Sequence, residues 1–338
     1  MRDPAALEEH LSRPREALVD DLRRLEGDIV VLGAAGKLGP SLVRLAVNGV
    51  AAAGTGGRVI AVSRFSSPGS ADQLREAGAE VVPADIADED ALAALPDAAN
   101  VVYLVGAKFG TDGNEHATWA TNAYLPGRVA ERYAGARISA LSTGNVYPLV
   151  PVGSGGCTEQ DPVGPVGEYA MSCLGRERVL THFARRNGTP MALIRLNYAV
   201  EMRYGVLVDL ARQLAAKERV DLTTGFANVV WQGYASEVTL RALLHADVPP
   251  FVLNLTGPET LSIRKAATRL AALLGVEATF SSAETDTALL SDASHCHGLF
   301  GYPQVGVDEL LTATAEWIRT GQPLLDKPTH FQSRDGKF

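Results

Sequence analysis

The chain has 338 residues, of which 46% are hydrophobic, and its formal net charge at pH 7 is -8. A chain of this length can bury the core of one large α/β unit, or of a nucleotide-binding domain with a smaller partner. Lys and Arg are scattered along an acidic chain, which argues against nucleic acid or a membrane surface as the partner and favours a small molecule.

Cysteine usage and hydropathy bear on the cellular compartment. The three cysteines are an odd number without paired spacing, so no disulfide framework is expected and a reducing cytoplasm fits. The first residues are not a basic segment followed by an apolar stretch, and no run approaches the roughly 20 apolar residues that span a bilayer. We therefore expect a soluble, cytoplasmic protein.

The first two thirds of the chain predict a parallel α/β sheet. Residues 1–27 form an expected helical extension, in which leucines recur among charged residues. In residues 28–195, short apolar runs alternate with helical stretches, which is typical of a doubly wound sheet covered by helices. The expected strands are Ile29–Leu32, Val59–Val62, Val81–Val82, Val101–Val105, Ile138–Leu141 and Ala192–Ile194. The expected helices are Pro40–Val47, Ala71–Ala77, Glu89–Leu95, Thr118–Tyr133 and Tyr169–Arg186.

The last third has a looser rhythm. Residues 196–320 are interpreted as a smaller α/β lobe over the carboxyl edge of the sheet, exchanging segments with the first domain, and residues 321–338 as a polar tail. The expected elements of this lobe are a short strand at Val252–Leu255 and helices at Val206–Ala216, Glu237–His245, Ile263–Leu274 and Val307–Ile318.

A glycine-rich turn follows the first expected strand. Glycines stand at positions 33, 36 and 39, and Pro40 suits the first turn of the helix that follows. Glycine permits a tight turn and the close approach of a pyrophosphate, while the N–H groups of the helix point at the negative charge. This strand-turn-helix context predicts a nicotinamide dinucleotide site that includes Gly33, Gly36, Lys37, Leu38 and Gly39.

The end of the second expected strand bears on the choice of dinucleotide. An acidic residue at this point binds the ribose hydroxyls of NAD, but here Ser63 and Arg64 follow the apolar run. Arg64 can pair with the 2′-phosphate of NADP, and Lys37 in the glycine turn is a candidate second cation. NADP is therefore favoured over NAD, unless Arg64 is merely a solvated surface residue.

Further motifs resemble the extended short-chain dehydrogenase/reductase family, which contains sugar-nucleotide epimerases and dehydratases. Asp85–Asp88 is similar to the family's adenine-contacting motif after the third strand, and Asn100–Lys108 resembles its fourth strand and the following loop. Asn122 matches its helix asparagine. The resemblance implies a Rossmann-type fold with a smaller substrate lobe, and cofactor contacts at Asp85, Ile86, Val105, Gly106 and Lys108.

The run Ser142–Tyr147 resembles the family's fifth-strand motif. The likeness places Thr143 at the substrate-facing hydroxyl, beside Ser142, and Asn145 where dehydratases carry an acid. A hydroxyl here can hydrogen-bond a carbonyl or alkoxide during hydride transfer, although both hydroxyls could instead bond the backbone at a strand end. We interpret Thr143 as functional.

The run Glu168–Glu177 resembles the helix that carries the family's Tyr-x-x-x-Lys motif, with Tyr169 as the tyrosine and Cys173 in place of the lysine. The family's lysine binds the nicotinamide ribose and lowers the pKa of the phenol, which is otherwise about 10. Tyr169 could act as a donor or proton shuttle, with Lys108 or Arg176 supplying positive charge. Cys173 could carry the chemistry if its pKa were depressed, or catalysis could be lost. For Cys173 alone, a small buried apolar residue is the simplest interpretation.

Segments of the second lobe bear on the substrate. Arg195–Asn197 resembles the family's Arg-x-x-Asn segment, which makes Asn197 a candidate substrate contact together with Thr143 and Asn145. No basic cluster marks a nucleotide diphosphate, so a free sugar, sugar acid or similar polyol fits at least as well as a sugar nucleotide. The run Ser294–His297 is not expected to bind a metal, because its histidines, two apart on a helix, point in different directions.

The resemblance therefore implies an NAD(P)-dependent enzyme that epimerises, dehydrates or reduces a sugar-like hydroxyl or carbonyl. The candidate catalytic residues are Tyr169, Thr143, Ser142 and Cys173. Two alternatives stay open, a non-catalytic NADP-binding redox sensor or regulator and a lyase or isomerase on the same scaffold. Helices that begin near Thr118 and Tyr169 pair across a two-fold axis in this family, so a homodimer is expected.

Overall fold

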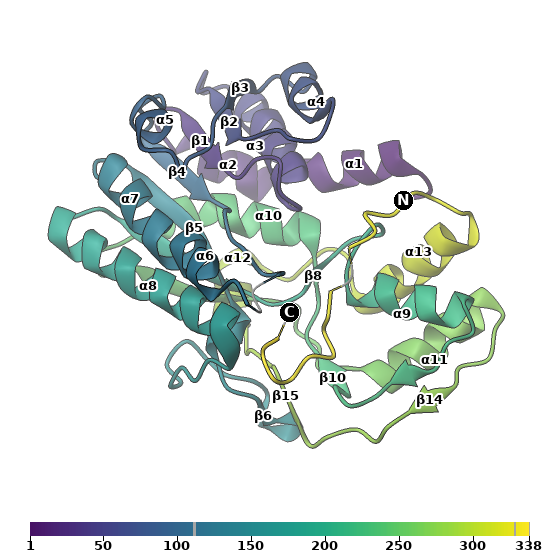
Figure 1. Cartoon of the computed structure of the whole chain (residues 1–338). Coiled ribbons are helices and arrows are strands. Elements are labelled where there is room, and N and C mark those ends of the chain that lie inside the picture. The colour runs from purple at the N-terminus through teal and green to yellow at the C-terminus, as the bar shows by residue number, and fades with distance from the viewer. Residues whose placement is uncertain (111–112, 328, 338) are drawn as a thin grey trace.

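A seven-stranded sheet forms the centre of the computed structural model, which describes residues 1–110, 113–327 and 329–337 (Figure 1). Its order is β12-β7-β5-β4-β1-β2-β3, and all neighbouring strands are parallel. The chain moves outward from β1 in both directions, so loops at the carboxyl ends of β1 and β4 diverge and leave a crevice. The doubly wound parallel sheet expected from the sequence is confirmed. Its strands are β1 (Ile29–Leu32), β2 (Val59–Ser63), β3 (Glu80–Pro83), β4 (Asn100–Tyr103), β5 (Arg137–Thr143), β7 (Met191–Leu196) and β12 (Phe251–Leu255).

Helices cover both faces of this sheet, which explains why β1 is apolar throughout. Ile29 and Val31 join the core on the side of α3 (Gly39–Ala53) and α10 (Gln232–Arg241). Val30 and Leu32 join the core on the side of α7 (Leu125–Arg132) and α8 (Gly167–Asn187), because successive side chains of a strand point to opposite faces. The shorter helices of this domain are α4 (Ser70–Glu76), α5 (Glu89–Ala93) and α6 (Glu115–Trp119).

The N-terminal extension packs against the layer of α3. Its helices, α1 (Pro4–Ser12) and α2 (Glu16–Arg23), both contact α3 (Figure 1). Gly49 permits the approach, since a Cβ there would lie 2.5 Å from Cδ1 of Leu22. Ion pairs of 2.6 Å between Arg15 and Glu237 and of 2.7 Å between Asp21 and Arg241 tie the extension to α10. The segment is therefore integral to the fold.

The second lobe contains a layer of three helices, α9 (Val206–Ala215), α11 (Ile263–Leu274) and α13 (Val307–Arg319), which pack against one another. The strand expected at 252–255 does not belong to this lobe, because β12 pairs with β7 at the edge of the central sheet. An apolar run of this length is equally suited to either sheet, so its neighbour could not be read from the sequence. The remaining elements are β6 (Val150–Pro151), β8 (Ala199–Val200), β9 (Val220–Asp221), β10 (Phe226–Ala227), β11 (Val230–Trp231), β13 (Leu261–Ser262), β14 (Phe280–Ser281), β15 (Thr287–Ala288) and α12 (Ser294–Phe300).

Two further expectations are corrected. The helix expected over 118–133 is interrupted by a π-helical turn, Ala120–Tyr124, between α6 and α7. The C-terminal segment is not a free polar tail, because it folds back across the molecule (Figure 1) and buries Phe331 to 1% exposure in the core of the second lobe.

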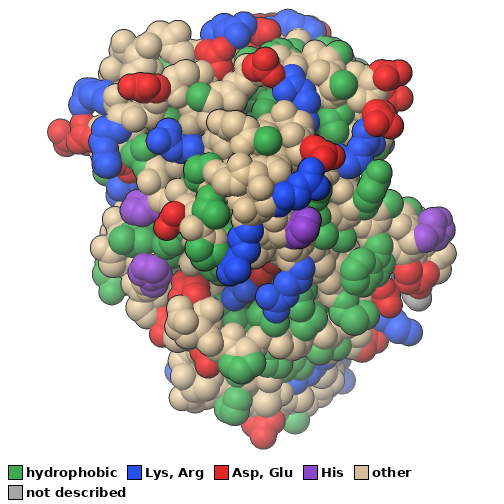
Figure 2. Space-filling model, turned by 90° about the vertical axis from the view of Figure 1, so that its left-hand side faces the viewer, with side chains coloured by type: hydrophobic (Ala, Val, Ile, Leu, Met, Phe, Trp, Pro, Cys, Tyr) green, Lys and Arg blue, Asp and Glu red, His purple; other side chains and the backbone are tan. Residues whose placement is uncertain are grey.

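The surface carries mixed charge. On the face shown in Figure 2, acidic and basic side chains are interspersed over the upper half, with apolar side chains between them. Within the described part of the chain, no helix is both long and apolar enough to cross a membrane.

Candidate active site

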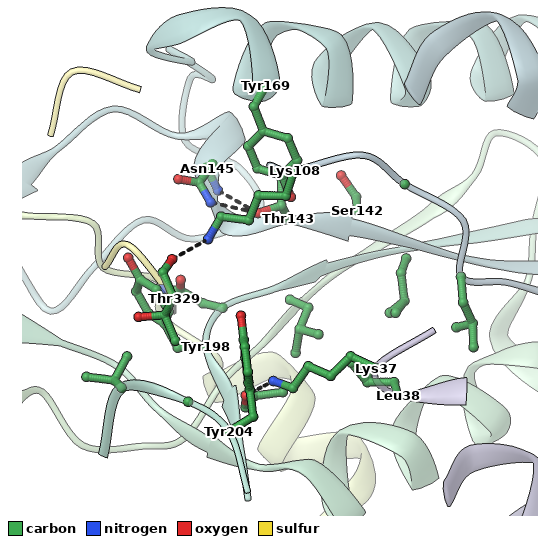
Figure 3. Close-up of a pocket in the computed structure, with 18 of the residues that line it drawn as sticks. Lys37, Leu38, Lys108, Ser142, Thr143, Asn145, Tyr169, Tyr198, Tyr204 and Thr329 are labelled. Carbon is green, nitrogen blue, oxygen red and sulfur yellow. Dashed lines mark hydrogen bonds between the residues drawn. The ribbon is translucent and has the colours of Figure 1, made fainter. Parts of the chain in front are cut away.

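A cavity of about 240 Å³ lies at the carboxyl edge of the sheet, between the two lobes (Figure 3). Loops after β1, β4 and β5 and the start of α8 form one side of it, and the second lobe and the C-terminal segment form the other. The loops contribute Lys37, Leu38, Gly106, Lys108, Thr143 and Asn145, and α8 contributes Tyr169 and Arg176. The opposite side consists mainly of Asn197, Tyr198, Ala199, Tyr204 and Thr329.

The glycine turn between β1 and α3 has the geometry of an anion cradle. Gly33 has a φ of +92°, a region that favours glycine. A Cβ on Gly39 would lie 2.2 Å from the carbonyl oxygen of Ala34, so the turn closes only without a side chain there. No side chain caps the start of α3 at Leu38, which leaves the first N–H groups of the helix available to a phosphate. These residues fit the pyrophosphate of a dinucleotide.

The loops after β2 and β3 lie outside the cavity. Arg64 and Asp85 are both exposed, and their charged atoms are 3.9 Å apart. Ser63 ends β2, and Ile86 is buried. An arginine held on the surface only by this long pair is accessible to an added phosphate.

Lys37 points away from that surface and into the cavity. Its Nζ donates a 2.7 Å hydrogen bond to the carbonyl of Ala199 and lies 3.6 Å from the centre of the Tyr204 ring. Burial lowers its pKa to about 7, against the opposing effect of Glu201. The expectation that Lys37 and Arg64 act on one phosphate is therefore not met, because Lys37 contacts the second lobe.

Thr143 and Tyr169 meet at one edge of the cavity. The backbone N–H and Nδ2 of Asn145 donate to Oγ1 of Thr143 at 3.2 and 2.9 Å, so the hydroxyl of Thr143 is left to act as a donor. The phenol of Tyr169 is hydrogen-bonded to Thr143 and Cys173. Figure 3 shows the phenol and the Thr143 side chain on the same side of the site. Two hydroxyls thus converge on one point, as a substrate oxygen would require.

The sequence of this chain matches a known protein family. Residues 29–222 match the NAD dependent epimerase/dehydratase family. The chain belongs to this family. No curated protein sequence is found to match it.

Solved structures of other family members share the fold. UDP-glucuronic acid 4-epimerase from Bacillus cereus, in complex with NAD, has 20% sequence identity and a TM-score of 0.73, over 87% of this chain and 99% of its own. DesIV, the dTDP-glucose 4,6-dehydratase from Streptomyces venezuelae with NAD and TYD bound, has 20% identity and a TM-score of 0.73, over 87% and 97%. UDP-glucose 4-epimerase from Thermotoga maritima, with UDP-glucose, has 19% identity and a TM-score of 0.68, over 87% and 99%. At such identities the likeness concerns the fold.

Cys173, at the position of the family's lysine, is a buried neutral group. Its side chain packs with Val146, Tyr147 and Cys157 and is 1% exposed. Burial raises the pKa of the thiol, although the charge of Arg176 opposes the shift. A nucleophilic thiolate needs the opposite shift, so this burial argues against a reactive thiolate at Cys173.

Arg176 places a positive charge at the floor of the cavity, one helical turn beyond Cys173. Its guanidinium donates to the carbonyls of Leu141 at 2.6 Å and Asn122 at 3.1 Å, and to Oδ1 of Asn122 at 3.0 Å. All these partners are neutral oxygens. The charge opposes the rise in the pKa of Tyr169 that burial causes. Gly106 makes room for the guanidinium, since a Cβ there would lie 2.9 Å from its NH2 group.

Asn122 positions the loop that carries Lys108. Its Oδ1 accepts from the N–H of Ala107, and its Nδ2 donates to the carbonyl of Ala107 and to Oγ of Ser172, at 2.8, 2.8 and 3.0 Å. Asn122 lies within the π-helical turn, a feature that often marks functional sites. The loop after β4 is therefore clamped to α8.

Ser142 belongs to a buried polar network and also lines the cavity. Its hydroxyl donates at 2.6 Å to Glu177, whose carboxylate pairs with Arg195 at 2.7 Å. Arg195 in turn donates to the phenol of Tyr147, which donates to Asn254. The hydroxyl of Ser142 is therefore engaged with Glu177, and its catalytic role stays a prediction.

Lys108 crosses the cavity from the loop after β4 toward the C-terminal segment. Its Nζ donates a 3.3 Å hydrogen bond to the carbonyl of Thr329 (Figure 3). Burial lowers its pKa to about 8, while the carboxylate of Asp209 acts in the opposite direction. Asn197, the expected substrate contact, is buried beside Gly144 and lines the same cavity.

The run Ser294–His297, which is not expected to bind a metal, begins α12. The His297 ring is 3.1 Å from the Thr256 carbonyl, and Cys296 Sγ is 3.5 Å from the Tyr234 hydroxyl. Among the described residues, no cluster of His, Cys, Asp and Glu is arranged to hold a metal ion.

Proposed function

We propose that this enzyme transfers a hydride between a nicotinamide dinucleotide and a hydroxyl or carbonyl carbon of a sugar-derived substrate. One observation carries the proposal: a single cavity is lined both by the glycine turn, through Lys37 and Leu38, and by the hydroxyl pair Thr143 and Tyr169. A dinucleotide on the turn would extend toward the same point at which two proton-carrying groups meet.

The dinucleotide would be held mainly by backbone. The turn from Gly33 to Gly39 and the first N–H groups of α3 receive the pyrophosphate, and Val105 and Gly106 border the path into the cavity. When bound, the nicotinamide ring supplies a carbon that accepts or returns a hydride. The protein supplies orientation, exclusion of water and the accompanying proton transfer.

The proton would move through Tyr169. Thr143 holds the substrate oxygen with its hydroxyl, because Asn145 already occupies the acceptor side of Oγ1. Burial raises the pKa of the phenol, so Tyr169 starts as a neutral donor. Its role as a base depends on the nearby charge of Arg176, which would replace the charge that the family's lysine provides.

Asn145 narrows the reaction type. The amide has no ionisable proton and is engaged with Thr143, so it cannot act as the acid that dehydratases of this family carry at the position it resembles. Reduction, oxidation or epimerisation at a hydroxyl-bearing carbon needs only hydride and one proton relay, and these reactions are favoured over dehydration.

Further features support the finer parts of the proposal. Exposed Arg64 at the end of β2 favours NADP. Trp119 in α6, Tyr124 in the π-helical turn and Met171 in α8 are exposed and suit a homodimer interface. Three unpaired, buried cysteines fit a reducing, cytoplasmic setting.

The test is Tyr169→Phe, with Tyr302→Phe as control because Tyr302 is 66% exposed in the second lobe. Turnover with a sugar-derived panel should fall by about 10²- to 10⁴-fold in Tyr169→Phe while dinucleotide affinity is kept. Equal turnover in both variants would refute the proton role. Dinucleotide binding without oxidation or reduction of any carbohydrate would favour the redox-sensor alternative, which the replacement of lysine by Cys173 motivates.

A further inference from the structure

The C-terminal segment 329–337 is anchored to the second lobe. The N–H and hydroxyl of Thr329 both donate to Oδ2 of Asp209, at 2.9 and 2.6 Å, and Phe331 is buried to 1% exposure. Farther along, Arg334 donates to the carbonyl and hydroxyl oxygens of Thr287 at 2.8 and 2.7 Å. These contacts hold a segment without regular structure in one place.

The same segment also contacts the first domain. Lys108 bonds to the carbonyl of Thr329, and the His330 ring lies 5.7 Å from that of Phe109. Gly336 packs so closely on the start of α8 that a Cβ would lie 2.2 Å from the carbonyl of Val166. The segment therefore bridges the two lobes beside the helix that carries Tyr169.

Little space remains on the far side of this bridge. The hollow there has a volume of about 30 Å³ and shares Asn145 and Tyr198 with the main cavity, while Phe331, Arg334 and Gly336 fill its wall. That volume is close to the roughly 30 Å³ that one water takes up in the liquid. The main cavity of about 240 Å³ is smaller than the roughly 300–1,000 Å³ typical of pockets for drug-sized ligands. A nucleoside diphosphate attached to the substrate would therefore have to displace the wall that Phe331, Arg334 and Gly336 form.

The charge of the cavity indicates the kind of small substrate. Lys37, Lys108 and Arg176 line it, and among the described residues that line it there is no Asp or Glu. Lys37 adjoins the glycine turn, where a cofactor phosphate would add negative charge, and Arg176 is bonded to neutral oxygens beneath it. Lys108 is the cation beside Thr143 and Asn145, at the substrate end (Figure 3).

We infer that the site takes a small sugar acid, whose carboxylate binds Lys108, and that segment 329–337 is the specificity element that excludes nucleotide sugars. This inference rests on the proposed function, since it assigns the substrate class of the same site. The carbonyl of Thr329 orients the ammonium group of Lys108. A substrate carboxylate would give this ammonium group a partner with a full negative charge in place of the carbonyl dipole.

A binding experiment separates this inference from the proposed function. Dinucleotide-saturated protein is titrated calorimetrically with aldonic and uronic acids of small size, with the matching neutral polyols or aldoses, and with UDP-glucuronic acid and UDP-glucose. At least one free acid should bind about ten-fold or more tightly than its neutral counterpart, the effect of one charged hydrogen bond, and the UDP-sugars should give no heat. Tighter binding of UDP-sugars or of neutral sugars would overturn the inference, whereas failure to bind any dinucleotide would overturn the proposed function itself.

Two sets of variants test the named groups. Lys108→Met should remove the preference for acid over neutral ligand, Lys108→Arg should keep most of it, and Lys265→Met on the exposed side of α11 should change nothing.

Gly336→Val should displace the segment and raise KM for the acid about ten-fold or more without weakening dinucleotide binding. Gly321→Val is the matched control, because Gly321 also has a positive φ, +66°, but open space around it. The inference would be contradicted if Lys108→Met kept the preference for acid over neutral ligand. It would also be contradicted if Gly336→Val kept the wild-type KM for the acid although faster hydrogen exchange showed that segment 329–337 was displaced.

Discussion

Under the proposed function, the two ends of the cavity recognise their ligands by different means. At the dinucleotide end, the contacts would come from the backbone of one short turn and the start of α3, within residues 33–39. At the substrate end they would come from the side chains of Lys108, Thr143 and Tyr169, on three separate segments, and a fourth segment supplies the carbonyl of Thr329. A site built from backbone groups is determined by a few neighbouring residues and tolerates few substitutions. A site built from side chains can lose a charged residue at one position and have a charged residue at another. The replacement of lysine by Cys173 occurs at the second end.

The sharpest test of the backbone end is Gly39→Ala. The added Cβ would lie 2.2 Å from the Ala34 carbonyl and would open the turn. Dinucleotide affinity should fall at least about 100-fold, which corresponds to about 2.7 kcal/mol, as measured by nicotinamide fluorescence titration. Gly135→Ala, at a glycine with open space around it, is the control and should bind normally. Equal affinities in the two variants would show that the turn does not hold the cofactor.

The side-chain end is tested by Arg176→Met. Loss of the positive charge should raise the pKa of Tyr169 further, because Arg176 opposes the effect of burial. The phenolate would then form only at higher pH, so kcat should fall about 10- to 100-fold and the rising limb of its pH profile should move to higher pH.

The controls for this prediction separate charge from folding. Arg176→Lys should restore part of the rate and of the pH profile, and Arg178→Met on the exposed side of α8 should leave both unchanged. A lower melting temperature with a normal pH profile would mean that Arg176 is only structural.

Some features of the molecule can be predicted from the sequence, and others cannot. The sheet, the glycine turn and Tyr169 follow from local patterns, because alternation and turn chemistry depend on neighbouring residues. The partner strand of β12, the burial of Phe331 and the bond from Lys108 to Thr329 depend on contacts between distant segments, which no local pattern encodes.

The positive charge of Arg176 beside Tyr169 also follows from the sequence. Arg176 lies three residues after Cys173 and therefore on the same helix face, where its long side chain can reach the place of the missing lysine.

Discrimination between cofactors gives a smaller effect. Arg64→Ala should reduce the preference for NADPH over NADH by about ten-fold, because one charge-assisted contact to the 2′-phosphate is lost. Arg75→Ala, on nearby exposed α4, is the control and should keep the wild-type ratio. The ratio of the two dissociation constants is the measurement. A wild-type ratio in Arg64→Ala would assign no role to this residue in cofactor choice.

The pH dependence of substrate binding gives the smallest effect. Burial lowers the pKa of Lys108 to about 8, so its charge is present below that pH and is lost as the pH rises through it. KM for a sugar acid should therefore rise about four-fold between pH 7 and 8.5. Lys108→Arg should bind the acid equally well at both values, and a constant KM in the wild type would contradict the role of the lysine charge.

The most direct test of the whole account is native mass spectrometry of the purified protein with added NAD, NADH, NADP or NADPH. We expect one dinucleotide per chain on the wild-type protein and none on Gly39→Ala. If the wild type retained none of the four, or if Gly39→Ala retained as much as the wild type, the proposed site would be contradicted.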